Sequence, residues 1–219
     1  MKQERFRAFV RFFLSLFFIF GLGYALRCHG WFMDKNAFNY VGGRSVEIIN
    51  NKIVPSHKIF VLLKHSNVPN VPVYMARTDA IKKELMKLPP VENVYIRRYA
   101  FPARIQIIVR ERIPVITISP DAKVQPVAFF TTDGKLIGKE FLPLDKSFKT
   151  ILVLSYGNKG DDYRKWDLKK IHEIEKITKY VETYSGEPVE YIDLRTPNDA
   201  FVKIKTVNIR LGQLDENVY

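Results

Sequence analysis

The feature that most constrains this chain is an apolar run close to its N-terminus. From Phe12 to Leu26 the sequence carries no charged side chain and is dense in phenylalanine. Extended back to Ala8, the run takes in one charge, Arg11. As a helix, residues 8–26 are about 28 Å long, which is close to the roughly 30 Å hydrocarbon thickness of a bilayer. The run therefore predicts a single membrane-spanning helix.

Basic side chains crowd the N-terminal flank of this run. They are Lys2, Arg5, Arg7 and Arg11, and the positive-inside rule places such a flank in the cytoplasm. We expect residues 1–7 to form a short cytoplasmic tail and the bulk of the chain to lie outside the inner (cytoplasmic) membrane. A cleaved signal peptide has the same charge pattern and is the alternative, with Gly23-Tyr24-Ala25 as a weak cleavage site.

The remaining composition is that of a folded protein. Of the 219 residues, 47% are hydrophobic and 26% are charged, with a net charge of +12. A basic balance fits nucleic acid, an anionic membrane surface or an acidic partner, and the predicted topology disfavours nucleic acid. The single cysteine, Cys28, excludes an internal disulfide.

Two modules are expected beyond a juxtamembrane linker over residues 27–44. The first, residues 45–113, has the order β-α-α-β-β, with two short helices on one face of a three-stranded sheet. Its elements are a strand over Ser45–Ile49, a helix from Ser56, a helix from Thr78-Asp79 that Pro89-Pro90 stops, and strands over Val91–Tyr99 and Ala103–Glu111.

The second module, residues 114–219, is expected to be rich in β-structure with one long helix. Asp133-Gly134 predicts a hairpin turn, and an apolar stripe from Leu168 to Tyr184 predicts the helix. Strands are expected over Ile151–Ser155, Val189–Leu194 and Phe201–Leu211. The whole chain is therefore assigned to the α+β class.

Arginines gather on the sheet face of the first module that the alternating pattern predicts to be exposed to solvent. They are Arg97, Arg98, Arg104, Arg110 and Arg112. Two interpretations stay open, a solvated face or a contact with anionic headgroups or an acidic partner near the membrane. For Glu111 and Arg112 we expect a surface salt bridge that positions the junction between the two modules. The alternative is that they act as a functional pair at the end of a strand.

In this order of elements, and most specifically over Asp79–Pro114, the chain resembles the FtsQ/DivIB family of bacterial cell-division proteins. That family has one membrane helix, a POTRA domain and a β-rich domain. Its motif is matched by Asp79, Leu85, Pro89, Val91, Val94, Arg98, Pro102, Glu111, Arg112 and Pro114.

The resemblance implies a non-enzymatic scaffold of the cell-division machinery. Its partners would be membrane-bound division proteins of the FtsB and FtsL type, with an FtsK-type protein as a further possibility, and it would control septal peptidoglycan synthesis by other enzymes. Strand addition at an open sheet edge is the expected mode of binding. The candidate edge carries Phe201, Lys203, Lys205, Val207, Ile209 and Leu211.

The C-terminus departs from the family pattern. In the family, the element matched by Leu211-Gly212 is followed by another helix and a last strand that docks the partners. This sequence ends at Tyr219. Two interpretations stay open: a C-terminal fragment, which we expect, or a member that lacks that strand.

No catalytic, cofactor or metal site and no small-molecule substrate is expected. The histidines His29, His57, His65 and His172 are scattered, and the sequence has no phosphate-binding loop, nucleophile elbow or HExxH motif. Turn chemistry explains the paired Asp161-Asp162. The alternatives to a division scaffold are a POTRA-bearing transport or assembly factor that binds client strands, and a membrane-anchored envelope enzyme.

Overall fold

The computed structural model describes residues 2–26, 29–39, 43–68, 70–157, 162–196 and 198–212. The chain divides into two compact units. The first contains Met1–Ile49, Ser56–Leu85 and Val94–Val109, and the second contains Asn50–Pro55, Met86–Asn93 and Arg110–Tyr219. Helices and strands are both present in each unit, so the α+β class is confirmed.

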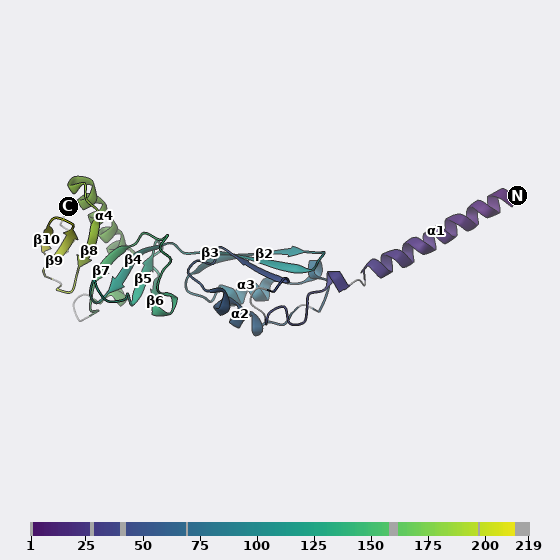
Figure 1. The fold of residues 1–219 in the computed structure, drawn as a ribbon, viewed down its shortest axis with the longest axis horizontal. Coiled ribbons are helices and arrows are strands. Elements are labelled where there is room, and N and C mark those ends of the chain that lie inside the picture. The colour runs from purple at the N-terminus through teal and green to yellow at the C-terminus, as the bar shows by residue number, and fades with distance from the viewer. Residues whose placement is uncertain are drawn as a thin grey trace. The chain divides into compact units, whose positions relative to one another are not determined.

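The chain begins with the helix α1 (Lys2–Leu26), drawn in purple in Figure 1. Its large apolar side chains are exposed, Phe17 at 79% and Phe20 at 70% for example. Among the helices that the structure describes, none combines the length and the apolarity needed to cross a membrane. The membrane-spanning role of residues 8–26 therefore stays a prediction, and the side chains of Lys2 and Arg5 lie outside the described residues.

A three-stranded sheet organises the region of the first module. Its strands are β1 (Val46–Ile49), β2 (Val91–Tyr99) and β3 (Arg104–Glu111), in the order β1-β3-β2. The strand β1 runs parallel to β3, with Val46 opposite Ile105. All three predicted strands are therefore confirmed to within a residue.

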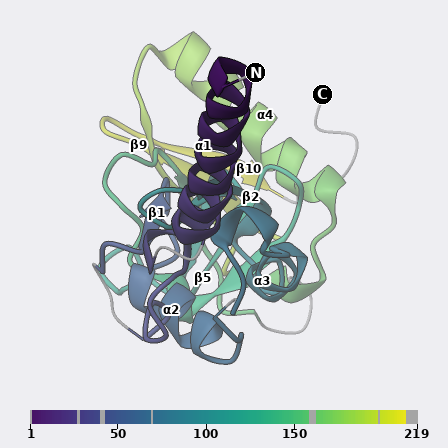
Figure 2. The same cartoon turned by 90° about the vertical axis from the view of Figure 1, so that its right-hand side faces the viewer.

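Two helices, α2 (Ser56–Lys64) and α3 (Asp79–Leu85), pack against each other beside this sheet (Figures 1 and 2). They bury the apolar side chains that the helical period aligns, which are Ile59, Phe60, Leu63, Ile81 and Leu85. Short 3-10 helices η1 (His29–Trp31) and η2 (Val73–Met75) complete the unit. The order β-α-α-β-β is confirmed.

The second unit is built on a seven-stranded sheet in the order β10-β9-β8-β7-β4-β5-β6. The neighbouring strands β8, β7 and β4 run parallel, and the other pairs are antiparallel. The strands are β4 (Pro114–Ser119), β5 (Ala128–Thr131), β6 (Leu136–Gly138), β7 (Ile151–Leu154), β8 (Val189–Asp193), β9 (Ala200–Ile204) and β10 (Asn208–Gly212). The helices η3 (Lys139–Phe141) and η4 (Tyr163–Lys165) lie in its connections.

The helix α4 (Leu168–Ser185) is the crossover that lets β7 and β8 run parallel. It begins because the Asp167 carboxylate accepts a hydrogen bond from the Lys170 N–H at 2.9 Å. It ends where Gly186 takes φ +70°, the left-handed conformation that favours glycine. Its buried side chains are Ile171, Ile174, Thr178 and Val181, and the three apolar ones join a core built on the sheet.

Two sequence-based expectations for this unit need correction. Phe201–Leu211 is not one strand but two, β9 and β10, with a turn at Lys205-Thr206. The prediction was wrong because the segment contains no Gly, Pro or Asp to mark the turn. The apolar stripe predicted from Leu168 to Tyr184 is also too long, because the side chains at its two ends, Leu168 and Tyr184, are exposed.

Candidate protein-binding edge

The strand β10 forms one edge of the seven-stranded sheet. Within the described residues its only strand neighbour is β9, with Ile209 opposite Val202 and Arg210 opposite Phe201. An edge strand leaves part of its backbone N–H and C=O groups available to another chain. This edge is therefore a candidate binding site for a partner that adds a strand.

The hairpin geometry determines which backbone groups face the open side. The turn closes with a hydrogen bond from the Ile204 N–H to the Val207 carbonyl at 3.1 Å. Because hydrogen-bonded pairs alternate along an antiparallel ladder, the next such pair is Val202 with Ile209. The N–H and C=O groups of Asn208 and Arg210 then point away from β9, toward the open edge.

A groove of about 940 Å³ runs between the C-terminal half of α4 and β10. From the sheet side Ile209 and Leu211 line it, both half-buried against the core. From α4 come Tyr180 and Tyr184, which are 64% and 74% exposed. Their ring centroids are 4.3 Å apart. Exposed aromatic side chains beside an open edge are typical of protein-binding surfaces.

Two glutamates at and just after the end of α4 accept hydrogen bonds from neighbouring segments. Glu187 accepts hydrogen bonds from Thr206, and Glu182 accepts one from the Val189 N–H at 3.1 Å. Arg210 forms an ion pair with Asp199 across the β9–β10 hairpin. The turn, the helix end and the edge strand are thus tied to one another.

Only part of the predicted edge lies on the edge strand. Ile209 and Leu211 are on β10, whereas Phe201 and Lys203 are on the inner strand β9. Lys205 and Val207 lie in the connection between these strands. The tyrosines of α4 were missed as site residues, although their i, i+4 spacing puts both on one helix face.

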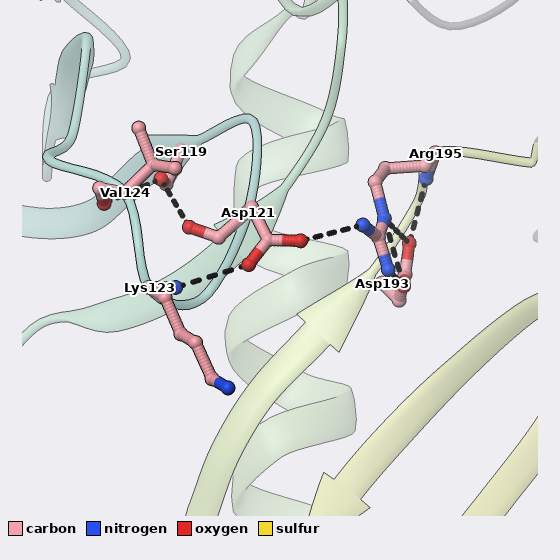
Figure 3. A network of polar contacts seen from close by, with 6 residues as sticks. All are labelled: Ser119, Asp121, Lys123, Val124, Asp193 and Arg195. Carbon is pink, nitrogen blue, oxygen red and sulfur yellow. Dashed lines mark hydrogen bonds and ion pairs between the residues drawn. The ribbon is translucent and has the colours of Figure 1, made fainter.

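A second polar cluster lies at the carboxyl ends of the parallel strands β4 and β8, and Figure 3 shows it. The Arg195 guanidinium contacts the Asp193 carboxylate at 2.5 Å and the Asp121 carboxylate at 3.1 Å. The buried Ser119 hydroxyl donates to the carbonyls of Asp121 and Val124 at 2.6 and 3.0 Å. The hydrogen bond to Asp193 raises the pKa of Arg195 above its ordinary value. The ion pair between Asp121 and Arg195 connects the loop after β4 to the end of β8.

The motif residues Glu111 and Arg112 do not serve as the single salt bridge that was expected. The Glu111 carboxylate accepts three backbone hydrogen bonds, from the N–H groups of Lys52, Ile53 and Val54 at 2.8, 2.8 and 2.7 Å. Burial raises the pKa of Glu111, while these N–H groups and the charge of Lys52 oppose that rise.

Arg112 makes different contacts, because adjacent residues of an extended chain point to opposite sides. Its guanidinium donates to the Pro89 carbonyl at 3.2 Å and forms an ion pair with Asp133 of the predicted hairpin turn. Pro114 follows as the buried first residue of β4. Glu111 and Arg112 thus anchor two different segments within the second unit.

Four further motif residues, Asp79, Leu85, Arg98 and Pro102, lie in the first unit. Asp79 is the first residue of α3, and Leu85 is buried at its end. The Arg98 guanidinium donates to the carbonyls of Tyr74 and Ala76 at 3.0 and 2.8 Å. Pro102 follows Phe101 through a cis peptide bond.

Most arginines of the predicted solvent-facing sheet surface are exposed. Arg97, Arg98, Arg104 and Arg110 are exposed as expected, whereas the Arg112 side chain is only 18% exposed.

Among the residues described, no group of three or more His, Cys, Asp or Glu side chains is arranged to hold a metal ion. Asp161 lies outside the described residues, and Asp162 caps η4 by accepting from the Arg164 N–H at 3.1 Å.

Comparison with known proteins identifies one part of the chain. The family model of the FtsQ-type POTRA domain matches residues 43–112, a span that contains β1, α2, α3, β2 and β3. Among curated proteins, none matches this sequence.

Proposed function

We propose, from the premise that this chain is an FtsQ/DivIB-like POTRA-domain protein, that it is a non-enzymatic scaffold of bacterial cell division. The observation that carries the proposal is the FtsQ-type match over residues 43–112. POTRA domains are in general protein-interaction modules without catalytic groups. The proposed partners are membrane-bound division proteins of the FtsB and FtsL type, with an FtsK-type protein as a further candidate. Through them the protein would control septal peptidoglycan synthesis.

The proposal includes a membrane anchor formed by α1. Its support is the uncharged sequence from Phe12 to Leu26, the basic flank that contains Arg7 and Arg11, and the exposed apolar side chains of the helix. The N-terminus is cytoplasmic in this arrangement, and both units lie on the outer side of the inner membrane. Resistance of the membrane-bound protein to alkaline extraction, with cleavage by protease added to spheroplasts, tests this topology.

The proposed binding mode is strand addition at β10. The open side of β10 offers the backbone groups of Asn208 and Arg210, which supply affinity. The groove with Tyr180 and Tyr184 offers an apolar seat for the side chains that flank the added strand. Backbone pairing would hold the added strand, and the aromatic groove would select one partner by its side chains.

Depletion and co-purification together test the proposed role. Cells depleted of the protein are expected to fail in septation, and the full chain is expected to co-purify with FtsB- and FtsL-type proteins. Co-purification with outer-membrane assembly proteins instead would favour the transport alternative. Normal septation in depleted cells would refute the division role.

A further inference from the structure

One end of the first unit combines exposed apolar side chains with positive charge. We call it the tip and define it as residues 30–33, 71–77 and 97–104. It contains the 3-10 helix η2 and the turn between β2 and β3. All three segments belong to the first unit. The tip plays no part in the β10 edge, so its composition needs a separate explanation.

An aromatic cluster joins the three segments of the tip. The Trp31 ring centroid lies 5.6 Å from that of Phe101 and 6.0 Å from that of Tyr74. The Phe101 ring packs so closely on Gly30 that a Cβ there would collide with it. The Ala103 N–H also donates to the Gly30 carbonyl at 2.7 Å. The segment that follows α1 is therefore fixed to η2 and to the turn between β2 and β3.

The cluster does not bury its apolar surface. Phe101 is 64% exposed and Met75 is 63% exposed, and Tyr74 and Phe32 are 43% and 37% exposed. Contiguous apolar surface on a soluble domain is costly in water and marks a contact with another phase or molecule. Trp and Tyr side chains, such as those of Trp31 and Tyr74, are enriched at the membrane–water interface.

The charge of the tip has one sign. Its segments contain Arg77, Arg97, Arg98 and Arg104 and no aspartate or glutamate. Arg104 lies over the Tyr99 ring, 4.2 Å from its centroid. Exposed Lys and Arg side chains near an anionic leaflet strengthen binding to it. The charge is complementary to anionic lipid headgroups.

The tip also cannot lie far from the end of α1. Between Leu26 and Gly30 the chain spans at most about 14 Å, even fully extended. The Trp31 indole N–H donates to the carbonyl of Ala25 near the end of that helix. A bilayer that holds α1 therefore has its headgroup layer within reach of the tip.

We propose that the tip is a lipid-contact surface, seated in the anionic headgroup layer of the membrane that α1 enters. This inference rests on the proposed membrane anchor and adds to it, because an anchor alone leaves residues 75 and 101 free in water. Met75 and Phe101 enter the interface, and Arg77 and Arg97 pair with lipid phosphates. The contact restricts the orientation of the POTRA domain relative to the membrane.

The test places an environment-sensitive fluorophore at the tip of the full chain in lipid vesicles. The variant is Met75→Cys in a Cys28→Ser background, labelled with a nitrobenzoxadiazole dye. The vesicles contain phosphatidylcholine with or without phosphatidylglycerol, and nitroxide-labelled lipids act as quenchers. A surface-seated apolar group lies about 5–10 Å into the headgroup boundary, so we expect shallow nitroxides to quench the dye more strongly than deep ones.

The matched control carries the same dye at Val124→Cys, an exposed position in the second unit. Its emission should be unaffected by the quencher. Charge reversal by Arg77→Glu and Arg97→Glu should weaken quenching at position 75 in phosphatidylglycerol vesicles, as should high salt. Equal quenching with and without phosphatidylglycerol would overturn the anionic part of the proposal.

Flotation of the same vesicles separates this inference from the anchor on which it rests. If the protein floats with lipid but position 75 is not quenched, the tip proposal is wrong and the anchor stands. If the protein does not float and resists insertion, the anchor itself fails. Quenching at both positions 75 and 124 would show non-specific adsorption and would also overturn the proposal.

Discussion

Glu187 accepts two hydrogen bonds from Thr206, one from its backbone N–H at 3.2 Å and one from its hydroxyl at 3.0 Å. The pair connects the segment after α4 to the turn between β9 and β10. It explains why a turn forms at Lys205-Thr206, where the local sequence carries no turn signature.

Glu187→Ala should loosen that connection without unfolding the sheet. Two exposed hydrogen bonds are lost, so the free energy of unfolding should fall by about 0.5–1.5 kcal/mol. Urea denaturation measures this change, and amide exchange at Ile204 should quicken. Glu190→Ala, an exposed substitution on β8, is the control and should change the stability by less than about 0.5 kcal/mol. Equal effects of the two variants would show that Glu187 has no special role.

Asn208→Pro should abolish strand addition while leaving the hairpin folded. Proline removes the outward N–H of position 208, and proline is tolerated on edge strands where the N–H faces solvent. Binding of an FtsB-type partner should be lost, whereas Asn208→Ala, which keeps the N–H, should bind normally. Affinity is measured by isothermal titration, with circular dichroism to verify the fold. Normal binding by the proline variant would rule out backbone pairing at this edge.

Removing the paired tyrosines should weaken the same partner without affecting the fold. Tyr180→Ala and Tyr184→Ala alter exposed side chains, so the stability should change by no more than about 0.5 kcal/mol. Aromatic contacts in an interface are worth about 1–2 kcal/mol or more, so each variant should bind roughly tenfold more weakly. Tyr95→Ala, an exposed tyrosine of the first unit, is the matched control.

The titration of Glu111 should be visible in the pH dependence of stability. Burial raises its pKa above the ordinary value of 4.5, so the folded state holds the proton more tightly than the unfolded state. The stability that this group contributes is fully present below the unfolded pKa and is lost as the pH rises through the folded pKa.

Comparison with Glu111→Gln isolates that contribution, because glutamine does not titrate. The difference in unfolding free energy between the native protein and the variant should fall from about pH 3 upward and level off above the raised pKa. Urea denaturation at several pH values measures it. A difference that grows with pH would mean that the three backbone N–H groups outweigh burial and lower the pKa.

Much of the first unit could be predicted because its signals are local. Alternation of apolar residues marks β2 and β3. The helix before β2 was predicted to run to the Pro89-Pro90 pair, but α3 ends earlier, at Leu85. Arg98 was recognised only as a motif residue, since its acceptors, the carbonyls of Tyr74 and Ala76, lie far back in the chain. The separate contacts of Glu111 and Arg112 were missed for the same reason.

In the second unit, β4 was not identified as a strand, although it lies inside the sheet between β7 and β5. Its parallel pairing with β7 joins Ile116 to Ile151, and no local pattern encodes such a partner. The tyrosines of α4 were likewise assigned to no site, because β10 approaches them only in the folded chain.

The sequence alone determined the element types, the α+β class and the β-α-α-β-β order of the first module, because hydrophobic period, capping residues and prolines act over a few neighbouring residues. The tertiary structure decided which strand lies at the sheet edge and that α4 and β10 form one groove. It also decided where the last hairpin turns. Those outcomes depend on contacts between distant segments, such as Glu187 with Thr206 and β4 with β7, whose free energy exists only once the chain has folded.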